Sequence, residues 1–137
     1  MKKVAIVFAS TTGNTEAMAN AILEGAGSSA AIYNAADADS GAVLSADVIA
    51  LGSPAMGAEE LEDSMESFFS SIAASLSGKT VALFGSYDWG DGQWLETWKE
   101  RIVSSGASLF AEPLKAHLAP ESADIEACKA LGKALSA

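Results

Sequence analysis

The chain opens with an apolar run, Val4-Ala5-Ile6-Val7-Phe8-Ala9, which continues directly into a polar segment, Ser10-Thr11-Thr12-Gly13-Asn14-Thr15. The next residues, 16–22, have the composition of a helix. A buried strand that turns through small hydroxyl residues and one glycine into a helix points backbone N–H groups and hydroxyls at one place. We therefore expect segment 10–15 to bind an anion.

Segment 10–15 contains no lysine or arginine. It therefore lacks the lysine of a nucleotide-hydrolysing P-loop, and its single glycine does not match the GxGxxG turn of dinucleotide-binding folds. A phosphate group held by hydroxyls, backbone N–H groups and a helix N-terminus fits these residues. An ordinary helix start capped by a hydroxyl fits them equally well.

Five apolar runs along the chain are bounded by turn-forming residues and predict buried strands. They are Val4–Ala9, Ala30–Tyr33, Val48–Leu51, Val81–Phe84 and Ser108–Phe110, and the last can continue through Leu114–Leu118. Segments with helical periodicity lie between them at 16–22, 61–76 and 95–102, and a final one follows at 125–135. The crossover at 34–46 has the weakest pattern.

Alternating apolar strands and amphipathic helices predict an α/β fold. We expect a doubly wound, five-stranded parallel sheet with strand order 2-1-3-4-5 and helices on both faces. The length of 137 residues suits one domain spanning 1–137. In such a sheet a ligand lies outside the carboxyl ends of the strands, beside strands 1 and 3. The loops at 10–15, 52–60 and 85–92 are therefore expected to form one site.

The sequence is acidic, with a formal net charge of −10 from 8 basic and 18 acidic residues. A negative surface repels nucleic acid and anionic lipid and attracts basic partners. No segment is long and apolar enough to cross a membrane. The single cysteine, Cys128, excludes an internal disulfide, and no Cys or His pair has metal-ligand spacing. We expect a cytoplasmic protein without a metal, a nucleic-acid partner or a membrane partner.

The loops at 52–60 and 85–92 carry several glycines together with Met56, Tyr87 and Trp89. Aromatic rings on a glycine-rich loop are costly to expose unless they cover something flat, and methionine offers a polarisable side chain for the opposite face. These residues predict a planar heteroaromatic ring as the ligand. A receiver domain of a response regulator shares the topology, but it needs an acidic cluster after strand 1, where this chain has hydroxyls.

Three motifs follow one another along the chain: Ser10-Thr11-Thr12-Gly13-Asn14-Thr15, Pro54-Ala55-Met56-Gly57-x-Glu59 and Gly85-Ser86-Tyr87-x-Trp89-Gly90-x-Gly92. In order and spacing they resemble the FMN loops of short-chain bacterial flavodoxins of the clostridial type. The similarity extends over essentially the whole chain. The resemblance implies a flavodoxin-like fold with FMN as its cofactor.

The resemblance also implies a role for each motif residue. The FMN phosphate would be bound by Ser10, Thr11, Thr12, Gly13, Asn14 and Thr15, the ribityl chain would lie along Ser53, Pro54 and Ala55, and the pyrimidine side of the ring would be held by Ser86, Tyr87, Asp88, Trp89 and Gly90. Trp89 would stack on one face of the ring and Met56 on the other. Glu59 would accept a hydrogen bond from flavin N3–H. Gly57 would be the redox switch, because its peptide can rotate so that its carbonyl accepts a hydrogen bond from N5–H of the neutral semiquinone.

The function implied by the resemblance is electron transfer by a carrier that is not an enzyme and has no substrate of its own. It would work at low potential, cycling FMN mainly between semiquinone and hydroquinone, and would dock as a monomer on basic faces of reductases and ferredoxin-linked oxidoreductases. One alternative is a flavodoxin-fold FMN-dependent quinone or flavin reductase, which needs a substrate cavity beside the flavin. Another is an interaction module without a cofactor.

Two residues depart from the family pattern. Asp88 stands where close relatives commonly carry glycine, so the loop would be strained if its backbone needs a positive φ, and the carboxylate would lower the flavin potentials. Ala58 follows Gly57 without a side chain that can form a local hydrogen bond, which bears on the energetics of the peptide rotation.

Four residues outside the motifs have ordinary structural interpretations. Trp94 and Trp98 lie four residues apart on a predicted helix and are expected to pack in the core. Cys128 is expected to be a small buried apolar residue. His117 is expected at the surface, near the end of the fifth strand.

Overall fold

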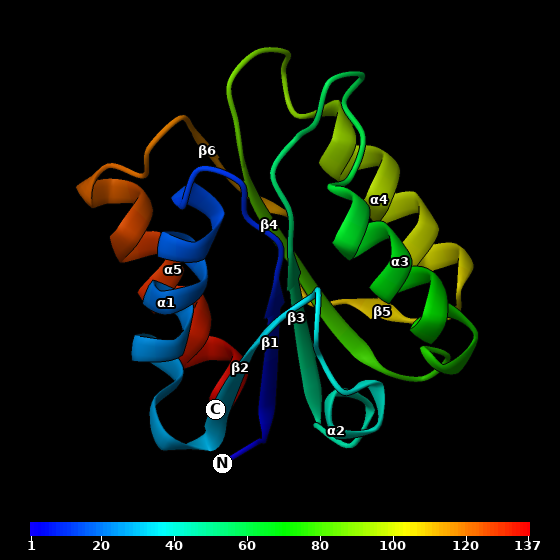
Figure 1. The fold of residues 1–137 in the computed structure, drawn as a ribbon. Helices are drawn as coiled ribbons and strands as arrows, with labels where there is room; N and C mark the ends of the chain where they lie inside the picture. Colours follow the sequence, from blue (N-terminus) through cyan, green and yellow to red (C-terminus); the bar gives the residue numbers. More distant parts are fainter.

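The computed structural model describes residues 1–137 and is built around the first apolar run, which forms β1 (Val4–Phe8). β1 pairs in parallel with β2 (Ala30–Asn34) on one side and with β3 (Val48–Gly52) on the other. β4 (Thr80–Tyr87) pairs with β3 and carries β5 (Ser108–Leu109) and β6 (Leu114–His117) on its outer edge. The strand order 2-1-3-4-5 is confirmed (Figure 1).

The fifth position of the sheet differs from the prediction in being occupied by two short strands. β5 pairs with Thr80 and Val81, and β6 pairs with the last four residues of β4. The segment between them includes Pro113, which has no N–H group to donate to a strand ladder. The expected continuation of the fifth strand therefore exists only as a separate strand, and it lies at the end of the sheet where the ligand loops are.

The prediction of five buried strands is correct only for the centre of the sheet. β1 and β3 are buried at every position, whereas β2 is partly exposed and β5 and β6 are mostly exposed or half-buried. The reason is that β2, β5 and β6 lie at the edges, where solvent reaches one side of the strand. The apolar composition of these segments does not show whether a strand lies at the edge or at the centre of the sheet.

Helices cover both faces of the sheet. α1 (Asn14–Ala26) and α5 (Ser122–Ser136) lie on one face, and α3 (Asp63–Ile72) and α4 (Gln93–Ser104) lie on the other (Figure 1). The weakly patterned crossover forms a short helix, α2 (Ser40–Leu44), whose start is capped by Asp39. Short 3₁₀ turns follow α1 at Gly27–Ser29 and α3 at Ala73–Ser75.

The core has two layers because β1 presents alternate residues to the two faces. Val4, Ile6 and Phe8 belong to a cluster of 14 buried residues under α1 and α5. Ala5 and Val7 belong to a cluster of 21 buried residues under α3 and α4. A strand covered on both faces has apolar residues at every position, which explains the continuous apolar run at Val4–Ala9.

The expected core residues outside the motifs are in place. Trp94, Trp98 and Cys128 are buried. Burial raises the pKa of the Cys128 thiol to about 12, with a smaller contribution from Asp124. This thiol therefore stays protonated at neutral pH and acts as a packing residue.

α1 and α5 approach closely at two glycines. A methyl group added at Gly132 would lie 2.0 Å from the carbonyl oxygen of Ile22, and one added at Gly25 would lie 1.9 Å from the carbonyl oxygen of Lys129. Since these neighbours are backbone atoms, they cannot move aside without shifting a helix. The contact therefore requires residues without a side chain.

We predict that Gly132→Ala lowers the free energy of unfolding by about 1–3 kcal/mol, the usual cost of overpacking. The matched control is Gly41→Ala in α2, where an added methyl group would have its nearest neighbour at 3.6 Å. Urea denaturation of the two variants and the parent chain measures the difference. Equal stability of both variants would contradict the close helix contact.

Candidate functional site

Three loops meet at the carboxyl ends of the parallel strands and form a groove of about 300 Å³. The loops lie at the upper end of the sheet in Figure 1. It is lined by Thr11, Thr12, Asn14, Pro54, Ala55, Met56, Gly57, Ser86, Tyr87, Asp88, Trp89 and Leu118. All of these residues except Leu118 belong to the three motif loops that the sequence predicts for the site.

Segment 10–15 does not form a hydroxyl-capped helix start. The N-cap residue of α1 is Gly13, with φ 92°, and no side chain caps the helix. Ser10 Oγ instead accepts a hydrogen bond from the Gly13 N–H at 3.0 Å, which closes the turn before the helix. Thr11 and Thr12 are exposed and line the groove. Their hydroxyls and the N–H groups of the first helical turn are therefore available to a ligand.

Thr15 connects segment 10–15 to the end of β4. Its hydroxyl lies 2.9 Å from the hydroxyl of Ser86, and this hydrogen bond is buried. Thr15 is 1% exposed and does not line the groove. It therefore holds two of the three loops together from beneath.

Ser53 supports the second loop from inside the protein. Its hydroxyl donates to the Pro54 carbonyl at 3.0 Å and accepts from the Glu62 N–H at 2.9 Å. Its carbonyl accepts from the indole N–H of Trp94 at 3.0 Å. Gly85 leaves room for this carbonyl, because an added methyl group there would lie 2.1 Å from it. Ser53 is fully buried, so the structure places it under the groove and not along it.

The tip of the second loop is a tight turn at residues 56–60. Met56 donates its N–H to the Glu60 carbonyl, and its own carbonyl accepts from the Glu59 N–H, both at 2.8 Å. No other atom lies within 4 Å of the position that a Gly57 Cβ would occupy. The peptide at Gly57 therefore borders on open space beside the groove.

Glu59 has a buried carboxylate oxygen without a hydrogen-bond partner. Its Oε1 is enclosed, and the carboxylate lies beside Gly90, where an added methyl group would be 2.8 Å from Cδ. Buried polar atoms in folded proteins nearly always have a partner. An unpaired acceptor between two of the ligand loops fits a ligand that brings an N–H donor.

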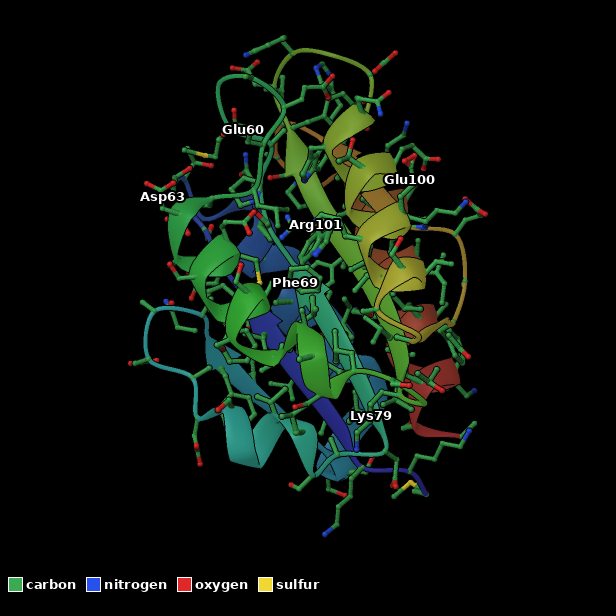
Figure 2. The ribbon with its side chains drawn as sticks, turned by 90° about the vertical axis from the view of Figure 1, so that its right-hand side faces the viewer. Glu60, Asp63, Phe69, Lys79, Glu100 and Arg101 are labelled. Atoms are coloured by element: carbon green, nitrogen blue, oxygen red, sulfur yellow. The ribbon has the colours of Figure 1, made fainter.

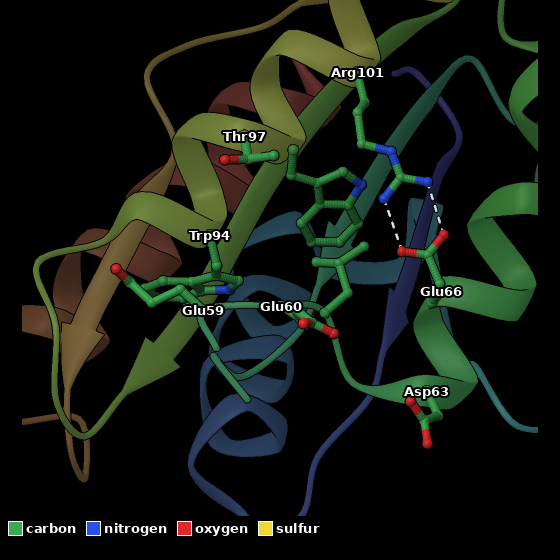
Figure 3. A pocket seen from close by; sticks show the side chains of 9 residues that line it. Glu59, Glu60, Asp63, Glu66, Trp94, Thr97 and Arg101 are labelled. Atoms are coloured by element: carbon green, nitrogen blue, oxygen red, sulfur yellow. Dashed lines mark hydrogen bonds and ion pairs between the residues drawn. The ribbon is translucent and has the colours of Figure 1, made fainter. Parts of the chain in front are cut away.

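Glu59 lines a second cavity, behind the turn at 56–60, and not the groove itself. This cavity, of about 290 Å³, lies between α3 and α4 and is also lined by Glu60, Asp63 and Trp94 (Figure 3). Gly90 lies on the other side of the Glu59 carboxylate and has φ 87°. Neither residue lines the groove in this structure.

An ion pair connects α3 and α4 at the wall of the second cavity. Arg101 donates to both Glu66 carboxylate oxygens at 2.8 and 2.7 Å, and its guanidinium lies 4.7 Å from the centre of the Phe69 ring (Figures 2 and 3). The hydrogen bonds from Arg101 lower the pKa of Glu66 and raise that of Arg101. Both side chains are partly exposed, so the pair holds two helices together at modest strength.

The third loop brings exposed apolar side chains to the groove. Trp89 is 60% exposed and Met56, on the second loop, is 36% exposed, and both line the groove. The Tyr87 ring, also in the lining, packs on Trp94 at a centroid distance of 5.6 Å. An exposed tryptophan and an exposed methionine on one groove offer two apolar faces to a flat ligand.

Asp88 does not have the positive φ that would have strained its backbone. The non-glycine residues with positive φ are Glu59, at 53°, and Leu118, at 61°. The positive φ values of this loop fall on Gly90 and Gly92 instead.

Leu118 and His117 are the site features that sequence reasoning missed. Leu118 follows β6, lines the groove and is 47% exposed. The imidazole of His117 is exposed, as expected, but it contacts the third loop through the Asp88 carbonyl. The rule that ligands lie at the carboxyl ends of strands could have pointed to both, had β6 been recognised as a strand in its own right.

The sequence and the fold match one protein family. The family model described as flavodoxin matches residues 6–132. This chain belongs to the flavodoxin family. It is 47% identical to a flavodoxin of Megasphaera elsdenii over 138 aligned residues, covering 96% of each chain, and 40% identical to one of Clostridium beijerinckii, covering 96% and 97%.

The structural comparison agrees with the sequence comparison. The solution structure of two-electron reduced Megasphaera elsdenii flavodoxin superposes with a TM-score of 0.84 at 46% identity, covering 97% of this chain and 98% of that one. Flavodoxins bind FMN and carry electrons between redox proteins, and they are not enzymes. The chain is accordingly an FMN-binding electron carrier, and the quinone or flavin reductase alternative is not favoured. None of its helices combines the length and apolarity that spanning a membrane requires.

We predict that Trp94→Phe destabilises the protein more than Trp98→Phe, by about 1 kcal/mol in the free energy of unfolding. Both indoles are buried, but only Trp94 donates its N–H, whereas the Trp98 Nε1 has no partner. The two variants lose the same ring volume, so chemical denaturation of both isolates the hydrogen bond to Ser53. A larger loss for Trp98→Phe would show that this bond contributes little.

Proposed function

We propose that FMN binds in the groove where the three loops meet, and that the chain is a low-potential electron carrier. The observation that carries this proposal is the convergence of hydroxyls from segment 10–15 and the exposed Met56 and Trp89 around one groove. The unpaired Glu59 oxygen lies behind this groove, in the adjoining cavity. When bound, FMN would supply one- and two-electron redox chemistry.

The residues present fit the parts of FMN. Segment 10–15 would hold the phosphate through the hydroxyls of Thr11 and Thr12 and the N–H groups of the first helical turn, without help from a lysine or arginine in the groove lining. Pro54 and Ala55 would lie along the ribityl chain, with Ser53 supporting them from below. Residues 86–90 would hold the pyrimidine side of the ring, between Trp89 on one face and Met56 on the other. The Glu59 carboxylate would accept the flavin N3–H, which provides its missing partner.

The charges around the groove would disfavour added negative charge on the ring. Asp88 lines the groove, and the carboxylates of Glu59, Glu60 and Asp63 surround the cavity behind it. Each raises the electrostatic free energy of a negative charge placed in the groove, most strongly where water is excluded. The potential for the second electron would therefore be low.

The Gly57 peptide would respond to the protonation of flavin N5. Rotation of this peptide would turn its carbonyl oxygen toward the groove, where it can accept an N–H hydrogen bond. The space around the Gly57 Cβ position is open, and glycine tolerates the backbone angles on either side of such a rotation.

Redox partners would approach the face that carries the groove. Acidic residues beside the groove, at Glu60, Glu62 and Asp63, would orient basic faces of reductases and ferredoxin-linked oxidoreductases, and docking would weaken as salt is added. We further infer that residues 1–137 form one FMN-binding domain that acts as a monomer. The single cysteine, which cannot form an internal disulfide, is consistent with a location in the cytoplasm.

The proposed function is tested by the visible absorbance of the purified chain. We expect flavin bands in the protein as isolated, or after FMN is added and the excess removed by gel filtration. The extracted flavin is then identified as FMN by chromatography. A chain that retains no FMN under these conditions would disprove the proposed site.

We predict that Gly57→Thr lowers the potential of the first one-electron step by about 40 mV, which corresponds to a hydrogen bond of about 1 kcal/mol. A branched side chain makes the rotated peptide less favourable, so the carbonyl bond to N5–H is weakened. Spectroelectrochemical titration gives both potentials, and their separation should change accordingly. Gly41→Thr, in α2 at the opposite end of the sheet, is the control and should leave both potentials in place. Unchanged potentials in Gly57→Thr would assign the switch to another residue.

A further inference from the structure

The third loop has almost no hydrogen bonds of its own. Between Tyr87, the last residue of β4, and Gly92, the N-cap of α4, residues 88–91 make no backbone-to-backbone hydrogen bond. Two side chains from β6 supply the only hydrogen bonds to this segment, and both bond to its carbonyl oxygens. The segment includes Trp89, the most exposed aromatic residue of the groove.

His117 holds the beginning of this segment. Its Nε2 lies 2.7 Å from the Asp88 carbonyl oxygen, and because a carbonyl only accepts, Nε2 carries the proton. The imidazole also packs against the Tyr87 ring at a centroid distance of 5.0 Å, and that ring in turn contacts Trp94. The next residue, Leu118, donates its N–H to the Tyr87 carbonyl at 2.7 Å.

Lys115 holds the end of the segment. Its ammonium group donates to the Asp91 carbonyl at 2.9 Å. Gly92, with φ 97°, leaves room for it, because a methyl group added there would lie 2.7 Å from the lysine Nζ. Since Lys115 and His117 both extend from β6, the two ends of segment 88–91 are held by one strand.

We propose that His117 and Lys115 are positioning residues for the isoalloxazine ring of FMN. Neither residue lines the groove, so each acts through the backbone of segment 88–91, which carries Trp89. Loss of either hydrogen bond frees one end of the segment, and ordering that end again opposes ring binding. This inference rests on the proposed FMN site and extends it to residues outside the three sequence motifs.

The proposal makes a distinction between the ring and the phosphate of FMN. Riboflavin carries the same ring without the phosphate, so a residue that positions the ring affects both ligands by the same factor. A residue that acts through its charge on the phosphate affects FMN alone. Comparing the two ligands therefore separates positioning from electrostatic attraction.

The experiment titrates the full chain, freed of flavin, with FMN and with riboflavin, and follows flavin fluorescence. We expect His117→Leu and Lys115→Met each to raise both dissociation constants by about three- to tenfold, as expected for a lost hydrogen bond. His117→Gln and Lys115→Arg keep an N–H donor and should restore most of the affinity. Lys99→Met removes the same unit charge from a lysine that pairs with Glu112 on the surface, and it should change neither constant.

The outcomes separate this inference from the proposed function. If the parent chain binds neither FMN nor riboflavin, the proposed site itself fails. If it binds both and His117→Leu and Lys115→Met bind them equally well, the positioning role is wrong although the site stands. If Lys115→Met weakens FMN alone, Lys115 acts through charge and the proposal fails for that residue. Should His117→Leu not fold, His117→Asn, whose shorter amide does not reach the Asp88 carbonyl, replaces it.

Discussion

The parallel pairing of β1 with both β2 and β3 is the constraint on which the rest of the structure depends. The chain leaves β1 through α1 on one face and leaves β3 through α3 on the other, so the direction of winding reverses between these two strands. At that point the connecting helices diverge and the carboxyl ends of the strands are left uncovered. The groove forms there, and the loops after β1, β3 and β4 reach it without any further rearrangement of the sheet.

Hydrogen bonds from residues beneath the loops hold the loops in their conformation. Thr15 and Ser86 join the first loop to the third, Trp94 and Ser53 join α4 to the second loop, and His117 joins β6 to the third. In each case a residue outside the groove lining bonds to a residue that lines the groove or lies directly beneath it. A loop without regular secondary structure is thereby held in one conformation before a ligand arrives, which lowers the entropy lost on binding.

Charge and polarity differ between the two ends of the proposed cofactor site. Segment 10–15 offers neutral donors and a helix N-terminus to a phosphate, whereas the turn at 56–60 and the adjacent α3 carry carboxylates. A carrier built in this way can bind an anionic cofactor firmly at one end and oppose extra electron density at the other. Glu59, Glu60 and Asp63, which contribute to the net charge of −10, line the cavity behind the groove.

The sequence by itself determined the order of the sheet, the three loops and eleven of the groove residues, because buried strands, amphipathic helices and glycine-rich loops are local patterns. It did not determine that β5 and β6 form the edge of the sheet as two separate strands, because the apolar residues on either side of Pro113 have the pattern of one continuous strand. The burial of Ser53, the unpaired oxygen of Glu59 and the contact of His117 with Asp88 were decided only by the tertiary structure. Each depends on atoms brought together from distant parts of the chain, and no local pattern encodes the distance between them.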